Sequence, residues 1–574
     1  MALEPGSGEL HLRLSEALLE SGDLEGAVGP ARRAAVLAPR SADAWAHLGI
    51  LQSFRGRKDP QALEEAQQSL RRAAQLMPSD PELWARLAEV AENRRDSDAA
   101  LKAWLRVGRL RPPFAIQGRS LETLAWERAT TLAARTQSYE ARREALMALC
   151  QAPQPEQAHL RQLEELAREQ VEKGFLGHAE ESFARLGSHF ADEPALWENV
   201  ALLQVRSQRY EEALATLQRA ESLRISTRTQ FHTGLCLMNL GRFAEAIPRW
   251  RQVQESPELQ KDPQFLEQAR LLLATALLLN GQPKALLEQG DSSLQGQLSP
   301  GLQALRIQAF VRLQTWTEAG EALRAALAAP VRSGLVRMLP GSLSAELQKG
   351  GALDRSARRE LQRLEREATA SLWAEFRQWQ PCLDTLDALR ADGPLRSIDP
   401  LLLASSALQE LGRPAEALNL LREAQRLNPS HPTLQNNLGY LLLELDQDLP
   451  EASTLIAAAL KQEPDNPSTL DSWGWALFKQ KRYAEAEPVL RRAAGLQPLN
   501  PEVLKHFGEA LLHLDRKAEA LDQWERALAF AFPERKALER RVQQLRADLA
   551  RQQPSEEPEP EPDPETTDEG EERR

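Results

Sequence analysis

Few residues of this 574-residue chain have the types and spacing that support catalysis or metal binding. His506 and His513 lie seven residues apart, a spacing that would place both imidazoles on one face of a helix. A zinc site would also need cysteine or carboxylate ligands held around them in a fixed geometry, for which the sequence gives no pattern. We therefore expect the two histidines to be solvated and not bound to a metal.

Motifs of the common enzyme classes are missing from the sequence. It has no GxxxxGK[ST] loop for phosphate, no GxGxxG after a strand, no HExxH and no GxSxG. Cys150, Cys236 and Cys382 lie far apart without a CxxC, which suits reduced thiols, although three cysteines also permit one disulfide. The acidic residues near the C-terminus alternate with proline and lack the pattern of a calcium loop. We expect no enzyme activity, no cofactor and no metal.

Most of the information in the chain lies in the spacing of its large, small and proline residues. Counted from Pro467, positions 4, 7, 8, 11, 20, 24, 27 and 32 are Leu470, Trp473, Gly474, Leu477, Ala486, Leu490, Ala493 and Pro498. Moving 34 residues on, seven of these positions are Leu504, Phe507, Gly508, Leu511, Ala520, Trp524 and Ala527. The preceding unit has one extra residue in its turn. In that unit, positions 7, 8, 11, 20, 24, 27 and 32 are Leu438, Gly439, Leu442, Ala452, Ile456, Ala459 and Pro464.

A 34-residue period with these residue types resembles the tetratricopeptide repeat (TPR), in bacterial form, in which each unit is two antiparallel helices. The resemblance implies an all-α fold, an α-solenoid superhelix of stacked helical hairpins. The residue types agree with that fold, because closely crossing helices need small contact residues such as Gly474 and Ala486. Larger side chains such as Leu490 fill the space around them, and Pro498 cannot continue the second helix. A single hairpin cannot bury its apolar face, so neighbouring units must stack.

The strength of the period divides the chain into regions, with roughly 13 or 14 units in all. We expect an N-terminal array at 1–114, a central degenerate array at 115–333, an irregular helical connector with one degenerate repeat at 334–397 and a C-terminal array at 398–534. Pro340-Gly341, Gly350-Gly351 and the charged run Arg355–Arg366 predict a loop, and a hinge or array boundary, between 331 and 362.

The C-terminal end has two further segments. In residues 535–552, Leu538, Val542, Leu545 and Leu549 form one apolar stripe among charged residues, as in a helix that caps a solenoid. A dimerising coiled coil is the alternative, but the segment is short for one. Residues 553–574 alternate proline with acid, and we expect this tail to be disordered because it cannot bury a core.

Charge and hydropathy exclude several classes of protein. The formal net charge is −12, of which 551–574 contributes −7 (ten acidic residues against three Arg), which leaves about −5 for the remainder. A nucleic-acid binder would need a basic face. The longest apolar runs are much shorter than a membrane span, and the N-terminus lacks a signal peptide or a lipobox cysteine. We therefore expect a cytoplasmic protein that does not bind nucleic acid and has no membrane span, with a monomer favoured.

The resemblance also implies a binding surface, since the first helix of each such unit lines a concave groove. In the C-terminal array the groove slots hold polar anchors, an aromatic floor and one acidic residue of the last unit. These residues are Asn436, Asp471 and Lys505, then Tyr440, Trp475 and Phe478, and Glu509. Aromatic side chains flanked by hydrogen-bonding groups suit an extended peptide or a helix. The alternative is that Trp475 and Phe478 simply pack between helices.

One well-known function of such repeats does not transfer to this chain. Repeats that grip a C-terminal carboxylate use Lys, Asn and Arg at set slots, where this chain has Leu402, Ser406, Asn437, Ser468 and Ser472. Only Asn437 matches.

The sequence therefore predicts a non-catalytic scaffold for a protein or peptide partner. Two alternatives stay open: a cell-envelope or pilus-assembly adaptor, since NNLGY (436–440) and LDSWGW (470–475) resemble bacterial envelope repeats, and a regulatory subunit of an enzyme complex.

Overall fold

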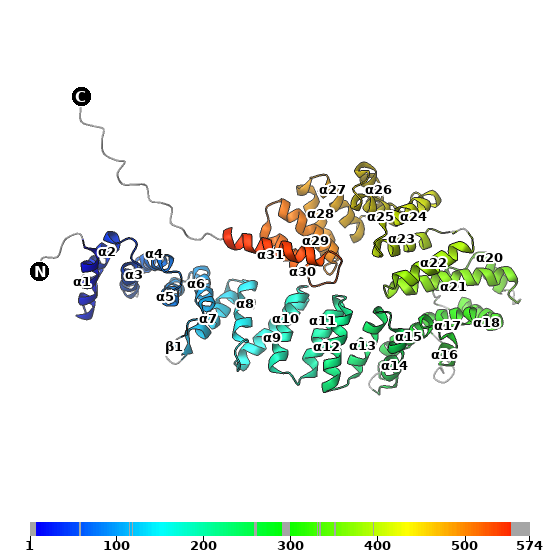
Figure 1. Ribbon diagram of the computed structural model, residues 1–574, viewed down its shortest axis with the longest axis horizontal. Coiled ribbons are helices and arrows are strands. Elements are labelled where there is room, and N and C mark those ends of the chain that lie inside the picture. Colours follow the sequence, from blue (N-terminus) through cyan, green and yellow to red (C-terminus); the bar gives the residue numbers. More distant parts are fainter. Residues whose placement is uncertain are drawn as a thin grey trace, which may run out of the picture. The chain divides into compact units, whose positions relative to one another are not determined.

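The computed structural model describes residues 7–552 apart from positions 57–58, 114, 117–118, 258–260, 290–298, 330, 332–333, 349–351, 394 and 396. Helices account for nearly all the regular structure of this described part, so the all-α prediction is confirmed (Figure 1). The tail expected to be disordered, 553–574, lies outside the described residues.

The described chain forms two compact units. The first unit holds the residues up to Glu169 together with those from Ala547 onward, and the second unit is Gln170–Arg546. The helices that begin in the first unit are α1 (Gly8–Glu20), α2 (Leu24–Leu37), α3 (Ala42–Arg55), α4 (Pro60–Leu76), α5 (Pro81–Asn93), α6 (Ser97–Leu110), α7 (Leu121–Arg135), α8 (Tyr139–Leu149) and α9 (Gln157–Glu172). Two strands of two residues, β1 (Ala115–Ile116) and β2 (Arg119–Ser120), pair antiparallel before α7. The repeat period does not predict these strands.

The remaining helices begin in the second unit. The first of them are α10 (Leu176–His189), α11 (Pro194–Arg206), α12 (Tyr210–Leu223), α13 (Thr227–Asn239), α14 (Phe243–Glu255), α15 (Pro263–Leu279), α16 (Pro283–Glu288), α17 (Pro300–Arg312), α18 (Trp316–Ala328), α19 (Gly334–Arg337), α20 (Gly341–Gln348), α21 (Arg355–Glu375) and α22 (Trp379–Ala391). They are followed by α23 (Asp399–Glu410), α24 (Pro414–Leu427), α25 (Pro432–Glu444), α26 (Leu449–Gln462), α27 (Pro467–Lys479), α28 (Tyr483–Leu496), α29 (Pro501–His513), α30 (Lys517–Ala527) and α31 (Arg535–Gln552).

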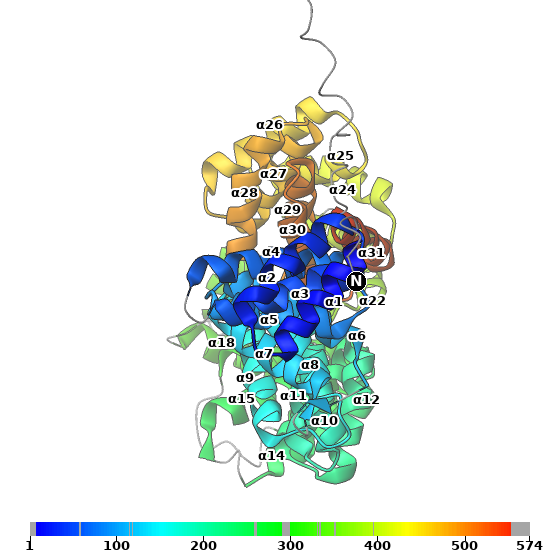
Figure 2. The same ribbon diagram turned by 90° about the vertical axis from the view of Figure 1, so that its left-hand side faces the viewer.

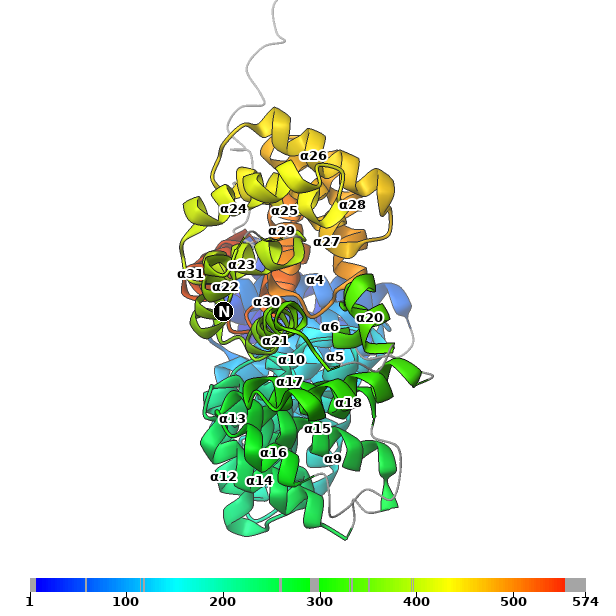
Figure 3. The same ribbon diagram turned by 90° about the vertical axis from the view of Figure 1, so that its right-hand side faces the viewer.

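Successive helices pack as hairpins, as the repeat period predicts. The closest helix pairs include α3 with α4, α1 with α2, α27 with α28 and α25 with α26. The hairpin of α1 and α2 can be followed in Figure 2, and the hairpin of α17 and α18 in Figure 3.

A residue with positive φ ends the first helix of many repeats. This residue is Gly241 or Gly412 in two of them, but Lys481 in α27's repeat and Asp515 in α29's. After α27 the N–H of Lys481 donates to the Phe478 carbonyl at 2.8 Å, and that of Arg482 to the Leu477 carbonyl at 3.0 Å. These bonds satisfy carbonyls that the helix end leaves without an intrahelical donor.

Small residues set the distance between the two helices of a repeat. A Cβ atom added at Gly474 would lie 2.5 Å from Leu490 Cγ, and one added at Gly439 would lie 2.6 Å from Ile456 Cγ1. Ala486, like the alanines in the same slot of neighbouring repeats, has no exposed surface. The predicted close crossing of the helices is confirmed.

The described part of the stretch from 331 to 362 differs from its prediction, and Gly350-Gly351 lies outside the described residues. The charged run Arg355–Arg366 is the first part of the 21-residue helix α21 and not a loop. Leu335 and Leu343, on the short helices α19 and α20, are buried in one core with Leu323 of α18 and Leu361 of α21. The apolar positions Ala357, Leu361 and Leu364 recur at helical spacing, and this buried face outweighs the local charge.

The last helix covers the final repeat with its apolar stripe. Within the second unit, Leu538, Val542 and Leu545 of α31 are buried. Arg541 of the same helix donates to Glu509 of α29 at 2.8 Å and lies 4.4 Å from the centre of the Trp524 ring. α31 spans Arg535–Gln552, the range expected for a capping helix.

Candidate functional site

A polar cleft of about 250 Å³ runs along the first helices of four consecutive repeats in the second unit. It is lined by residues of α23, α25, α27 and α29, with contributions from α22 and from the turn before α29. The lining residues are Trp379, Ser406, Gln409, Glu410, Asn436, Asn437, Tyr440, Ser468, Asp471, Ser472, Gln497, Asn500, Glu502 and Val503. The cleft therefore offers amides, hydroxyls and carboxylates to a ligand.

The repeat geometry explains why these side chains meet. Each slot of the pattern recurs every 34 residues, so equivalent helix faces from successive repeats align. Asparagine caps fix the starts of α27 and α29: Asn466 Oδ1 accepts from the N–H of Ser468 at 3.0 Å, and Asn500 Oδ1 accepts from that of Glu502 at 3.0 Å. These caps hold Ser468 and Glu502 at the edge of the cleft.

Three of the seven residues expected in the groove line this cleft: Asn436, Tyr440 and Asp471. The Oδ1 atom of Asn436 is buried without a donor among the described residues. Next to it, Asn437 makes no side-chain hydrogen bond within the described part of the chain and is half-buried. Because buried amide oxygens normally find a donor, Asn436 presents an acceptor that a ligand can satisfy.

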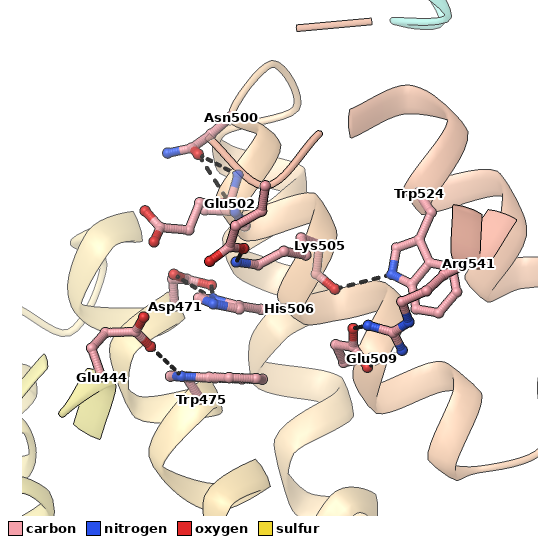
Figure 4. A network of polar contacts seen from close by, with 12 residues as sticks. Glu444, Asp471, Trp475, Asn500, Glu502, Lys505, His506, Glu509, Trp524 and Arg541 are labelled. Carbon is pink, nitrogen blue, oxygen red and sulfur yellow. Dashed lines mark hydrogen bonds and ion pairs between the residues drawn. The ribbon is translucent and has the colours of Figure 1, made fainter. Parts of the chain in front are cut away.

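Asp471 forms a buried pair with His506 of the next repeat. His506 Nδ1 lies 3.1 Å from both carboxylate oxygens, and the imidazole has no exposed surface (Figure 4). Burial lowers the pKa of His506, but the Asp471 carboxylate and its hydrogen bond, with Glu502, outweigh that effect and raise the pKa above 6.5. The prediction that both histidines are solvated is therefore wrong for His506. Its partner lies 35 residues earlier, one repeat and one position away, a relation that the two-histidine spacing did not reveal.

Tyr440 joins the cleft to α29 through its hydroxyl, which donates to the Glu502 carboxylate. Burial, together with Glu502 and Glu444, raises the pKa of Tyr440 well above 10. The phenol therefore keeps its proton and holds Glu502 in place as a neutral donor.

The other two expected aromatic residues do not line the cleft. The Trp475 ring stacks between Phe478, with ring centres 4.6 Å apart, and His506, with ring centres 4.1 Å apart. Its Nε1 donates to Glu444 at 2.9 Å (Figure 4). Phe478 also meets Tyr483 and the exposed His513. A continuous aromatic floor is not formed, because these rings stack on one another across α27, α28 and α29 instead of facing the cleft.

Lys505 and Glu509 do not reach the cleft either. The Lys505 ammonium lies 2.5 Å from Glu534, which precedes α31. The Glu509 carboxylate is buried against Arg541 of α31 (Figure 4). In this last repeat the capping segment supplies the partners of both side chains. Lys505, expected as a polar anchor of the groove, therefore has an acidic partner within the chain and stands outside this cleft.

Several cleft residues were missed as site residues. Ser406, Ser468 and Ser472 occupy the slots that carboxylate-gripping repeats fill with other residues, so in the sequence they only argued against that function. Their position in the cleft follows from the same slots. Glu410 and Glu502 carried no such signal, because one ends a helix and the other lies in a first turn.

The described chain offers little support for a metal or thiol centre. Burial raises the pKa of Cys236 to about 12 and that of Cys382 to about 11, so neither thiol is a ready nucleophile. In the first unit Glu127, Glu156 and His159 place one ligand atom each within 4.8 Å of one another. Glu127 already pairs with Arg119 at 3.4 Å and approaches His159 at 3.7 Å. Ion pairing accounts for this cluster.

Among the described residues, no helix has both the length and the hydropathy that crossing a membrane requires.

Known proteins share the repeat. The tetratricopeptide repeat model TPR_16 matches residues 55–113, 402–467 and 472–536. The TPR repeat-containing protein PA4667 of Pseudomonas aeruginosa is 28% identical over 159 residues, which are 25% of this chain and 26% of that protein. The chain thus spans about a quarter of the length of this curated relative.

Solved structures with similar helical arrangements match this chain with low TM-scores. The APC/C hetero-tetramer Cut9–Hcn1 has a TM-score of 0.29 at 15% identity, covering 92% of this chain and 96% of the matched chain. TTC0263, a thermophilic TPR protein of Thermus thermophilus, has a TM-score of 0.27 at 19% identity, covering 32% of this chain and 99% of its own. The Naa15/Naa10 complex bound to HypK-THB has a TM-score of 0.24 at 12% identity, covering 95% and 97%.

The family matches cover most of α23–α30, the helices that carry most of the polar cleft, but leave out residues 468–471 of α27. Stacked repeats of this type form an extended concave surface. The helical hairpins, the 34-residue period and the family matches together show that the chain contains tetratricopeptide repeats at residues 55–113, 402–467 and 472–536.

Proposed function

We propose that the chain is a non-catalytic scaffold that binds an extended segment of a partner protein in the polar cleft of α23, α25, α27 and α29. The observation that carries the proposal is the row of unsatisfied amides at the centre of the cleft. Asn437 has no side-chain hydrogen bond among the described residues, and Asn436 Oδ1 is buried without a donor.

Amides and hydroxyls suit the backbone of an extended peptide. Each peptide unit carries one N–H donor and one carbonyl acceptor, which an asparagine side chain can meet simultaneously. Asn437 and Ser472 occupy the same slot of consecutive repeats, and Ser406 lines the cleft in the repeat before them. An extended chain is the ligand shape that such a row can follow. A compact ligand would meet only part of this row.

The test is selection of linear peptides from a random phage-displayed library on the full chain. We expect Asn437→Ala to weaken the selected peptides by about tenfold, as loss of a central hydrogen bond does. Asn419→Ala is the matched control, because Asn419 lies exposed on the second helix of a repeat, away from the cleft. The proposal would be overturned if the selected peptides bound Asn437→Ala as tightly as Asn419→Ala. Failure to select any peptide would also overturn it.

A further inference from the structure

The polar cleft has an unbalanced set of charges. Three carboxylates line it, from Glu410, Asp471 and Glu502, and none of its lining residues is Lys, Arg or His. The amides and hydroxyls around them are neutral. A ligand that enters this cleft therefore meets negative charge and hydrogen-bond acceptors first.

The three carboxylates differ in how far the protein neutralises them. Asp471 is paired with the buried His506, and Glu410 meets Arg377 at 3.4 Å on the exposed side. Glu502 accepts only from the neutral Tyr440 hydroxyl among the side chains described, and its own side chain is exposed. The negative charge of Glu502 is thus available to a ligand at the position to which Tyr440 fixes it.

Other features of the cleft suit a cation. The buried Asn436 Oδ1 adds an acceptor without a donor, at a residue that is 8% exposed. Trp379 and Tyr440 contribute aromatic rings to the lining, and ring faces attract ammonium and guanidinium groups. At about 250 Å³ the cleft is smaller than the ~300–1,000 Å³ sites that hold drug-sized ligands, which favours a single long side chain.

We infer that the cleft selects a lysine or arginine side chain within the extended segment that it binds, with Glu502, Glu410 and Asn436 as its acceptors. This inference rests on the proposed function, since it names the kind of partner that the cleft accepts. Charge-assisted hydrogen bonds to the two glutamates hold the cation. A peptide C-terminal carboxylate is disfavoured, because it would meet like charge and no basic side chain.

The experiment uses peptides that were selected on the full chain and that bind more weakly to the Asn437→Ala variant. These are called Asn437-dependent peptides. We expect lysine or arginine at one fixed position, and replacement of that residue by norleucine to weaken binding at least about tenfold. Glu502→Gln together with Glu410→Gln should reduce this difference to about threefold or less and leave the norleucine peptide's affinity unchanged. Unchanged circular dichroism would show that the variant is folded.

Glu463→Gln is the matched control, because Glu463 also accepts from a neutral donor, Asn466 Nδ2 at 2.7 Å, but lies outside the cleft. It should leave the preference for the cation intact. Asn437-dependent peptides without a fixed basic residue, or a preference that survives the double Gln variant, would overturn the inference while leaving the proposed function standing. Absence of any Asn437-dependent peptide would overturn both.

Discussion

Helices α27–α30 and helices α17–α21 both bury apolar faces, but different residues fix their packing. In α27–α30 the helices approach through Gly474 and Gly508, against which Leu490 and Trp524 pack. Between α17 and α21, a polar network takes that role: Arg312 Nε lies 2.6 Å from Glu365 Oε1, and Arg312 Nη2 lies 2.7 Å from Thr369 Oγ1.

The comparison shows where the repeat period is lost. A close helix contact needs a glycine or alanine at one slot of the repeat. That residue type therefore recurs with the repeat period and can be recognised in a single sequence. A buried polar network needs partners far apart in the chain, such as Arg312 and Glu365, separated by 53 residues. Such partners leave no period, and the irregular helices α19 and α20 lie between them.

The largest expected effect is on the polar network. Arg312→Leu leaves the mostly buried Glu365 carboxylate without its cation, and we expect a loss of about 3 kcal/mol in the free energy of unfolding, the lower end of the range for breaking a buried pair. Urea unfolding measures it.

The double variant Arg312→Leu, Glu365→Leu is its control, because two apolar side chains leave no buried charge behind. We expect it to recover most of the lost stability. Equal losses in the single and double variants would show that the pair does not fix this packing.

A smaller loss of stability is expected at the glycine contacts between helices. Gly474→Ala places a Cβ atom 2.5 Å from Leu490 Cγ, and we expect overpacking to cost about 1–3 kcal/mol in urea unfolding. Gly495→Ala is the same chemical change on α28 with no atom within 4 Å of the added Cβ. It should be neutral or stabilising by about 0.5 kcal/mol, because alanine favours helix. If both variants lose the same stability, close helix contact is not the reason for Gly474.

The smallest effect is on pH dependence, and only in α27–α30. The pKa of His506 is raised above 6.5 in the folded chain, so its protonation stabilises the fold fully below about pH 6.5. This contribution is lost as pH rises through the raised pKa. We expect the melting temperature to fall between about pH 6 and pH 9 by more in the wild type than in His506→Gln.

Groups around His506 determine that result. The charges that act on the His506 imidazole are those of Asp471, Glu502 and Lys505. The rings of Trp475 and Tyr440 pack near it. His513→Gln is the control, because His513 is exposed and stacks on Tyr483. A wild-type pH dependence that His506→Gln retains would assign it to other groups.

The candidate site was predictable only in part. Asn436, Tyr440 and Asp471 reached the cleft, since their slots on the first helix of a repeat fix the direction of each side chain. Trp475 and Phe478 occupied the same kind of slot, yet stacking with His506 from the next repeat turned them to each other. Lys505 and Glu509 found their partners in the segment around α31, which follows the last repeat.

The sequence by itself determined the fold class, the helical hairpins and the close contacts at glycine and alanine, because these depend on residues within one period. Tertiary structure decided which polar groups are satisfied. His506 is buried because Asp471 of the preceding repeat faces it, and Glu502 keeps an available charge because Tyr440 is its neutral partner. Each of these outcomes depends on a side chain one or more repeats away, and the distance between such groups is fixed only when the repeats stack.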